Sequence, residues 1–138
     1  MYNSSHLSEK VLPEIRQLQQ NGHYLASFIM MMQAIEYLGA ILDGKPLKAR
    51  EQSKKRFSLA VRKLFGERYQ YFNRNNELYD QLRNHLMHAM SAGSHFELVS
   101  AVQAGENKHL TKNKGGKIIL IAEELLIDIE KAAQRITR

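Results

Sequence analysis

Four polar side chains that could act together on a phosphate ester lie within six positions of the chain. The segment LYDQLRNHLMHAM, residues 78–90, contains Arg83, Asn84, His85 and His88. Arginine carries a permanent, forked positive charge that suits phosphate oxygens, and histidine exchanges protons near neutral pH. His88 could therefore assist proton transfer at a ribose 2′-hydroxyl, while Arg83 neutralises charge that develops on the phosphorus oxygens. Such chemistry needs no metal ion.

A helix is predicted to carry these side chains. Its apolar stripe is formed at helical spacing by Leu78, Leu82, Leu86 and Ala89 or Met90. Asn75 or Asn76 would cap its start, and Gly93 would close its end. Arg83 and His88 are about 140° apart around an ideal helix, so their tips meet only through the length of the arginine or a bend in the helix.

The same segment also allows a purely structural interpretation. In that interpretation, Arg83 pairs with Asp80 or Glu77, and His88 bonds to Asn84. A third pairing involves Glu36, which lies in an otherwise apolar stretch and needs a partner if it is buried. Arg83 is one candidate for that partner.

The motif RNHLMH resembles the signature of the HEPN superfamily (higher eukaryotes and prokaryotes nucleotide-binding), which consists of compact helical bundles. That signature is an arginine, four to six residues and a histidine, often with an asparagine directly after the arginine. The same spacing runs from Arg16 to His23, but Asn21 and Gly22 would end the helix before that histidine. The resemblance covers about residues 24–93 in helix order, plus the C-terminal helix.

The resemblance implies a metal-independent ribonuclease without a cofactor, in which the motifs of two protomers line one cleft. A homodimer is therefore the implied assembly. Arg83 carries over as the phosphate stabiliser, His88 as the catalytic histidine and Asn84 as the residue that orients the phosphate or the histidine. His85 matches no role in the family, and some family members are degenerate or act only as binding partners.

Five helices are predicted to form the scaffold. They run from Ser8 or Pro13 to Gln20, from Tyr24 to Leu42, from a cap at Ser53 to Gly66, from about residue 77 to Gly93, and from about Glu123 to Thr137. The segment ERYQYFNRNN, residues 67–76, is predicted to connect the third and fourth helices. Its aromatic residues could stack on nucleobases or pack in the core.

Two short β-like runs interrupt the helical pattern. HFELVSAVQ and GKIILIA are joined by the polar stretch AGENKHLTKNKG and predict a β-hairpin or small meander at about residues 95–121. The expected fold is a single, mainly α domain over residues 1–138. It would be a HEPN-like up-and-down bundle of four to five helices, with the hairpin or meander inserted before the last helix.

The charge of the chain is concentrated in one segment. Residues 45–63 carry eight basic side chains against Glu51 alone, a net charge of +7 in a chain whose total is +6. This run is either a solvated helix face or a surface that contacts phosphates. In the second case, the nucleic-acid-binding residues would be Lys48, Arg50, Lys54, Lys55, Arg56, Arg62 and Lys63.

Composition removes several classes of protein. The chain has no cysteine, which excludes disulfides, a thiolate nucleophile and cysteine-rich zinc sites. The apolar stretch 25–42 contains Gln33 and Glu36 near its middle and is interpreted as a core helix, not a membrane span. No secretory signal is visible in the first fifteen residues, so a cytoplasmic protein without a membrane partner is expected.

Three hypotheses follow for the function. The first is a HEPN-like, metal-independent RNA endonuclease, as in a toxin or defence component, with RNA and a cognate antitoxin or another protein among its partners. The second is a non-catalytic HEPN-like dimer that binds nucleic acid or a protein. The third is a helical adaptor whose charge only confers solubility.

Overall fold

The computed structural model describes residues 3–46, 49 and 51–136, and it is mainly helical with one small sheet. Along the chain it contains α1 (Ser4–His6), η1 (Leu7–Val11), α2 (Leu12–Gln20), α3 (Tyr24–Asp43), α4 (Ser53–Leu64), α5 (Glu67–Phe72), η2 (Arg74–Asn76), η3 (Tyr79–Arg83), α6 (Asn84–Ala89), β1 (Phe96–Val99), α7 (Ala101–Ala104), β2 (Ile118–Ile121) and α8 (Ala122–Ile136). The segments η1 and η3 are π-helical turns, and η2 is a 3-10 turn.

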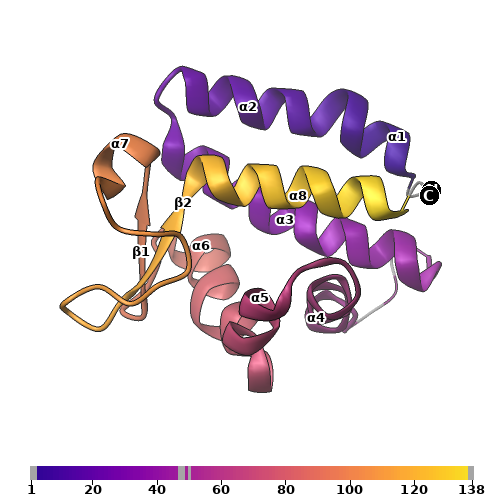
Figure 1. Ribbon diagram of the computed structural model, residues 1–138. Helices are drawn as coiled ribbons and strands as arrows, with labels where there is room; N and C mark the ends of the chain where they lie inside the picture. Colours follow the sequence, from indigo (N-terminus) through magenta and orange to yellow (C-terminus); the bar gives the residue numbers. More distant parts are fainter. Residues whose placement is uncertain (1–2, 47–48, 50, 137–138) are drawn as a thin grey trace.

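The helices form a bundle around α3. In Figure 1, α2 and α8 run side by side along α3, while α4, α5 and α6 lie below them. The two strands and α7 lie together at one end of the bundle. Helix α3 contacts α2, α4, α6 and α8, so it lies at the centre of the bundle.

The predicted core helix of residues 24–42 is present as α3. Phe28, Met32, Ile35 and Leu38 are buried on it, as its apolar spacing predicts. By length and composition, α3 is apolar enough to cross a membrane, and half of its most apolar window is buried inside the bundle. Leu25 and Leu42, which continue the same apolar spacing and would also be expected in the core, are exposed close to the two ends of the helix.

Helices α3 and α4 approach each other at Gly39. A β-carbon built on Gly39 would lie 1.8 Å from the backbone oxygen of Arg56, which is far inside van der Waals contact. The absent side chain therefore allows the backbone of α4 to lie directly on α3. An ion pair locks the contact, because Arg56 Nε donates to Asp43 Oδ2 at 2.7 Å and Arg56 Nη2 donates to the carbonyl oxygens of Lys45 and Pro46.

The predicted boundaries of α4 need correction. Ser53 is not the N-cap, since Gln52 holds that position and the Ser53 hydroxyl bonds to side chains of other helices. Gly66 is not a C′ glycine: its φ is −74°, and it is the N-cap of α5. The stretch predicted as a connection is in fact helical, because Tyr69 is buried against Phe65 and anchors α5 to the core.

The helix that carries the Arg-His motif is irregular. Asn75 and Asn76 have φ angles of 55° and 59°, so neither caps it in extended geometry as predicted. Instead, Asn73 Oδ1 accepts the backbone N–H of Tyr79 at 3.2 Å. The helix passes from the π-helical η3 into α6 and ends at Met90, whose φ is 53°, three residues before the predicted stop at Gly93.

The two strands are parallel, so the predicted β-hairpin or meander is wrong. Phe96 pairs with Ile118 and Val99 with Ile121. Parallel strands need a crossover connection, which the short helix α7 and a polar loop provide here. Ser100 and Gln103 form a reciprocal capping box at the start of α7. This helix turns the chain away from β1, so that the chain does not fold back directly as the second strand of a hairpin.

The two terminal helical regions agree with the prediction in type but not fully in extent. The first begins at Ser4, before either predicted start, and reaches Gln20 through the π-helical turn η1. The last runs from Ala122 to Ile136 and buries one apolar face that contains Leu125 and Ile129, with Ile136 only partly covered. A buried side chain near the end of α2 joins the two regions, since Gln19 Nε2 donates to the carbonyl oxygen of Ala122 at 3.0 Å.

Candidate functional site

Arg83 extends from the end of η3 toward α3. Its Nη2 donates to Glu36 Oε1 at 2.9 Å, and its Nη1 donates to Asn84 Oδ1 at 3.1 Å. The guanidinium carbon lies 5.0 Å from the centre of the Tyr79 ring. The side chain is only 14% exposed, and both hydrogen bonds are made to neighbouring side chains of the bundle.

Glu36 is the centre of a polar network between α3, α4 and η3. Ser53 donates its hydroxyl hydrogen to Glu36 Oε1 at 2.6 Å, so the hydroxyl of Tyr79, also 2.6 Å away, donates in turn to Ser53. Arg83 and Ser53 thus both donate to Oε1 of a carboxylate that lies in an apolar helix. The pairing of Glu36 with Arg83, predicted as one alternative, is therefore present.

The other predicted local pairings are replaced. Asp80 pairs with Lys54 at 3.0 Å and not with Arg83. Asn84 accepts from Arg83, and no hydrogen bond joins it to His88 in the part of the chain that the structure describes. One atom of Arg83 is still unsatisfied there, because its Nε is buried without a hydrogen-bond partner.

His88 lies apart from this network. It occupies the last turn of α6, is exposed, and makes no hydrogen bond or ion pair with any described residue. No hydrogen bond or ion pair joins Arg83 to His88 in the part of the chain that the structure describes. His85 is also exposed, and Gly93 passes so close to its ring that a β-carbon there would lie 2.9 Å from it. A single protomer thus brings Arg83 and Asn84 together but leaves His88 separate.

We expect Arg83→Ala to lower the free energy of unfolding by about 2 kcal/mol, because it leaves the 27%-exposed Glu36 without its cationic partner. Urea denaturation measures this loss. Combining Arg83→Met with Glu36→Gln should show a coupling of about 1 kcal/mol or more between the two positions. His88→Ala is the control, with an expected change below about 0.5 kcal/mol. Equal stability of Arg83→Ala and His88→Ala would contradict a structural role for Arg83.

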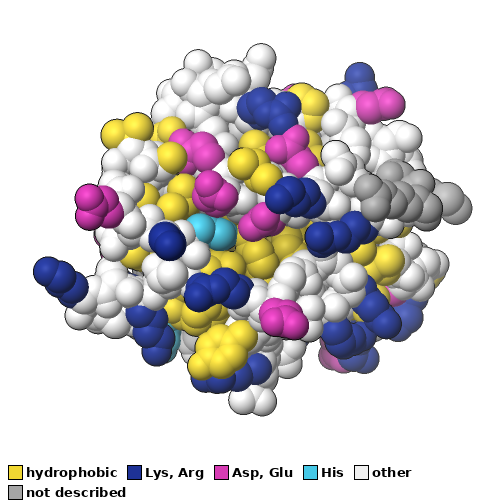
Figure 2. All heavy atoms as spheres, viewed as in Figure 1, with side chains coloured by type: hydrophobic (Ala, Val, Ile, Leu, Met, Phe, Trp, Pro, Cys, Tyr) yellow, Lys and Arg dark blue, Asp and Glu magenta, His cyan; other side chains and the backbone are white. Residues whose placement is uncertain are grey.

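The predicted nucleic-acid-binding residues that the structure describes divide into three groups. Lys55, Arg62 and Lys63 are exposed on α4 and pair with no described residue. Lys54 is exposed but pairs with Asp80 and lies 5.8 Å from the centre of the Tyr79 ring. Figure 2 shows basic side chains gathered at the lower right of this face, over α4.

Arg56 does not belong to this basic surface. Its side chain is 5% exposed, and its guanidinium is committed to Asp43 and to two backbone carbonyl groups. Burial would raise the pKa of Asp43, but hydrogen bonds from Arg56 and from the backbone of Lys45 outweigh it and hold that pKa below its usual range. Lys48 and Arg50 lie outside the described residues.

A second polar cluster, which the sequence did not predict, connects α5, α8 and the loop before β2. The Tyr69 hydroxyl lies 2.6 Å from Asp128 Oδ2 and 2.7 Å from His109 Nε2. The backbone N–H of Ile121 donates to His109 Nδ1 at 3.0 Å, so the neutral ring carries its proton on Nε2 and donates it to Tyr69. Tyr69 then donates to the Asp128 carboxylate.

Burial controls the protonation of this cluster. It lowers the pKa of His109 to about 4, although the charge of Asp128 acts in the opposite direction. Burial and the hydrogen bond to Asp128 raise the pKa of Tyr69 above its usual range. The three side chains line an open pocket of about 430 Å³, together with Arg68, Lys131 and Arg135.

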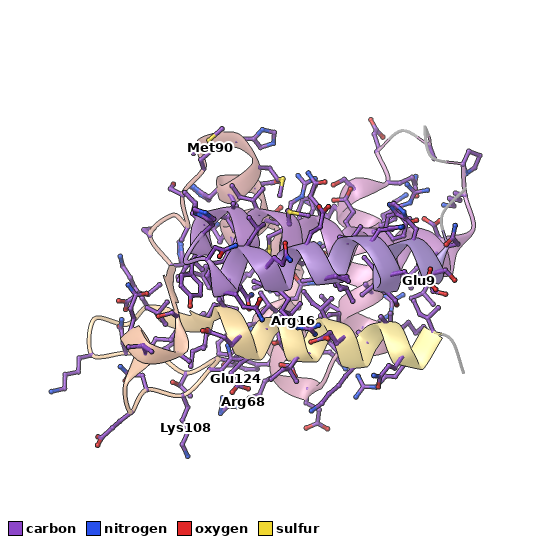
Figure 3. All side chains as sticks on the ribbon, turned by 90° about the horizontal axis from the view of Figure 1, so that it is seen from above. Glu9, Arg16, Arg68, Met90, Lys108 and Glu124 are labelled. Carbon is purple, nitrogen blue, oxygen red and sulfur yellow. The ribbon has the colours of Figure 1, made fainter. Side chains whose placement is uncertain are left out.

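The cluster and the Arg-His motif lie on different sides of the molecule. In Figure 3, Arg68, which lines the pocket of the cluster, lies on one side of the molecule, while Met90, at the end of α6, lies on the opposite side. Both ring nitrogens of His109 are occupied by internal hydrogen bonds. The cluster therefore joins the polar loop to the bundle and offers no free base.

No family model matches this chain, and no curated protein or solved structure matches it either. The HEPN resemblance accordingly remains a prediction based on the motif and the helix order. Among residues 3–46, 49 and 51–136, no group of three or more histidine and carboxylate side chains is placed to hold a metal ion.

Proposed function

We propose that this protein is a HEPN-like helical domain that binds single-stranded RNA through the exposed face of α4, with Arg83 in a structural role. The observation that carries the proposal is the set of three cations on that face, Lys55, Arg62 and Lys63, which have no partner among the described residues. Exposed cations that are not neutralised internally are available to phosphate oxygens. Releasing the counterions of those phosphates supplies the binding free energy.

The charge pattern favours a polyanion over a neutral protein partner. The chain as a whole carries a net charge of +6, and the segment that contains α4 accounts for more than that total. Residues outside the segment are nearly balanced, as on an ordinary soluble surface. A localised basic face of this kind raises the association rate with nucleic acid at low salt.

Charge reversal on α4 should weaken RNA binding and flatten its salt dependence. We expect the triple substitution Lys55→Glu, Arg62→Glu and Lys63→Glu to lower affinity for a single-stranded RNA at least tenfold. Losing three phosphate contacts should reduce the log-log salt slope by about 2, since each contact on a single strand contributes roughly 0.7. Fluorescence anisotropy between about 50 and 200 mM salt measures both quantities.

A single charge reversal far from α4 provides the control. Lys10 is exposed in η1, and η1 lies with α1 and α2 along the opposite edge of the bundle from α4 in Figure 1. Lys10→Glu changes the net charge but should leave the salt slope unchanged. It is compared with the single variant Lys55→Glu, which changes the net charge by the same amount. The proposal fails if both single variants lose affinity equally, or if the wild type binds no RNA at low salt.

RNA cleavage is the second candidate function, and His88 is the observation that favours it. The imidazole is exposed and unpaired within the described chain, as a group that transfers protons to a substrate must be. In a HEPN-like homodimer, a second protomer would bring another motif to it across α6, whose end exposes Met90. A toxin or defence role with a cognate antitoxin belongs to this candidate.

Cleavage is tested with purified protein and RNA in the presence of EDTA. The second candidate requires product from the wild type, a loss of at least about a hundredfold in His88→Ala, and a normal rate in His85→Ala, its neighbour on the same helix. Light scattering reports whether the protein is a dimer. If the wild type binds RNA but forms no cleavage product, the cleavage function is refuted and only the binding function remains.

A further inference from the structure

An amide-lined pocket lies beside the basic face, between α4, α5 and η2. Its volume is about 300 Å³, at the lower end of the range for small-molecule sites. It is lined by Ser58, Val61, Arg62, Gln70, Asn73, Asn75 and Asn76. Only Val61 among these is apolar, so the pocket is suited to a ligand with several hydrogen-bonding groups.

Internal hydrogen bonds hold the shape of the pocket. Ser58 donates to Asn76 Oδ1 at 2.6 Å and accepts from Asn73 Nδ2 at 3.1 Å. Asn73 Oδ1 accepts the backbone N–H of Tyr79, and Gln70 Nε2 donates to the carbonyl oxygen of Phe65. The walls are therefore fixed before any ligand enters, which lowers the entropic cost of binding.

Several groups remain uncommitted after these bonds are counted. Within the described chain, the guanidinium of Arg62 and the whole side-chain amide of Asn75 make no hydrogen bond, and Asn76 Nδ2 and Gln70 Oε1 are also free. Donors and acceptors thus line one small space. An inorganic anion would use only the donors, whereas the edge of a nucleobase presents both kinds of group.

Helical spacing brings phosphate-binding groups next to the pocket. Lys55, Ser58 and Arg62 are three and four positions apart, so they lie on one face of α4, and Ser58 is part of the pocket wall. A nucleotide whose base enters between the amides would therefore have its phosphates near Lys55 and Arg62. The basic face and the pocket form one continuous surface.

We propose that this pocket receives a single unpaired base of the bound RNA, with adenine preferred. This inference rests on the proposed RNA-binding function and assigns its base-reading residue. Side-chain amides pair bidentately with adenine, donating to one ring nitrogen and accepting from the exocyclic amine. Asn75 makes that contact, because its amide is entirely free, and Arg62 binds the adjacent phosphate.

The test compares RNA oligonucleotides of about 12 residues composed only of A, C or U, which differ in the base but not in phosphate charge. The wild type should bind oligo(A) at least fivefold more tightly than the other two. Asn75→Gly removes the amide and suits the local φ of 55°, so the turn is preserved. This variant should bind all three oligonucleotides equally, with an unchanged salt slope.

Asn21→Gly is the matched control, since Asn21 is an exposed asparagine at the end of α2 and should leave the preference intact. Equal binding of the three oligonucleotides by the wild type, or a preference that survives in Asn75→Gly, overturns the pocket assignment and leaves RNA binding by α4 standing. Failure of the wild type to bind any oligonucleotide at low salt overturns both.

Discussion

Gly39→Ala should lower the free energy of unfolding by about 3 kcal/mol or more, which is a large fraction of the stability of an ordinary domain. The new β-carbon would lie 1.8 Å from the Arg56 carbonyl oxygen, and the obstructing atom is backbone that cannot rotate away. Helices α3 and α4 would have to separate, weakening the ion pair between Asp43 and Arg56. The gain in helix propensity, about 1 kcal/mol, is too small to compensate. Circular dichroism during urea denaturation measures the loss.

Gly115→Ala is the matched control for that substitution. A β-carbon at Gly115 would meet only the side chain of Asn113, at an ordinary 3.4 Å, and the φ angle there is not in the left-handed region. We expect its stability to change by less than about 0.5 kcal/mol. If Gly39→Ala were as stable as Gly115→Ala, the close approach of α3 and α4 would be wrong.

Acid should destabilise the protein through His109. The folded state keeps His109 neutral, with a pKa of about 4, whereas the ordinary value that applies to the unfolded chain is 6.5. Below pH 6.5 the unfolded state therefore takes up a proton that the folded state does not, and stability falls as the pH is lowered. The loss approaches about 3 kcal/mol near pH 4, where the folded state also begins to protonate.

The contribution of His109 is isolated by comparing two proteins. Wild type and His109→Gln are denatured in urea at several values from pH 7 to about 4. His109→Gln should be less stable at pH 7, because Tyr69 and the Ile121 N–H lose their partner, but its stability should fall less steeply with acid. Parallel pH profiles for the two proteins would show that His109 titrates normally and that the cluster is not formed.

The longer helices α3, α4 and α8 could be predicted from the sequence because each carries a long apolar repeat. The buried faces of α3, α4 and α8 follow that repeat closely. Strand pairing was not predictable in the same way, since two four-residue runs fit a hairpin and a parallel pair equally well. The deciding feature was the capped helix α7, too short for its periodicity to be detected.

The polar contacts of the candidate site differ in how visible they were. Glu36 could be predicted to have a partner because it is a carboxylate within an apolar helix, and Arg83 is that partner. Arg56 was hidden in a run of basic residues, although it lies four positions before the buried Ala60 and so on the edge of the apolar stripe. His109 sits in a polar loop without periodicity, and its partners are distant in sequence.

Strand β2 continues directly into α8, so these two elements cannot move independently of each other. Ile121 is the last residue of the strand and Ala122 the first of the helix, with nothing between them to act as a hinge. Helix α8 packs along α2 and α3. Separating the strand pair from the bundle would therefore also displace α8 from these two helices. The strand pair β1 and β2 is therefore part of the cooperative core of the domain. Its backbone amide protons should exchange with solvent only when the entire domain unfolds.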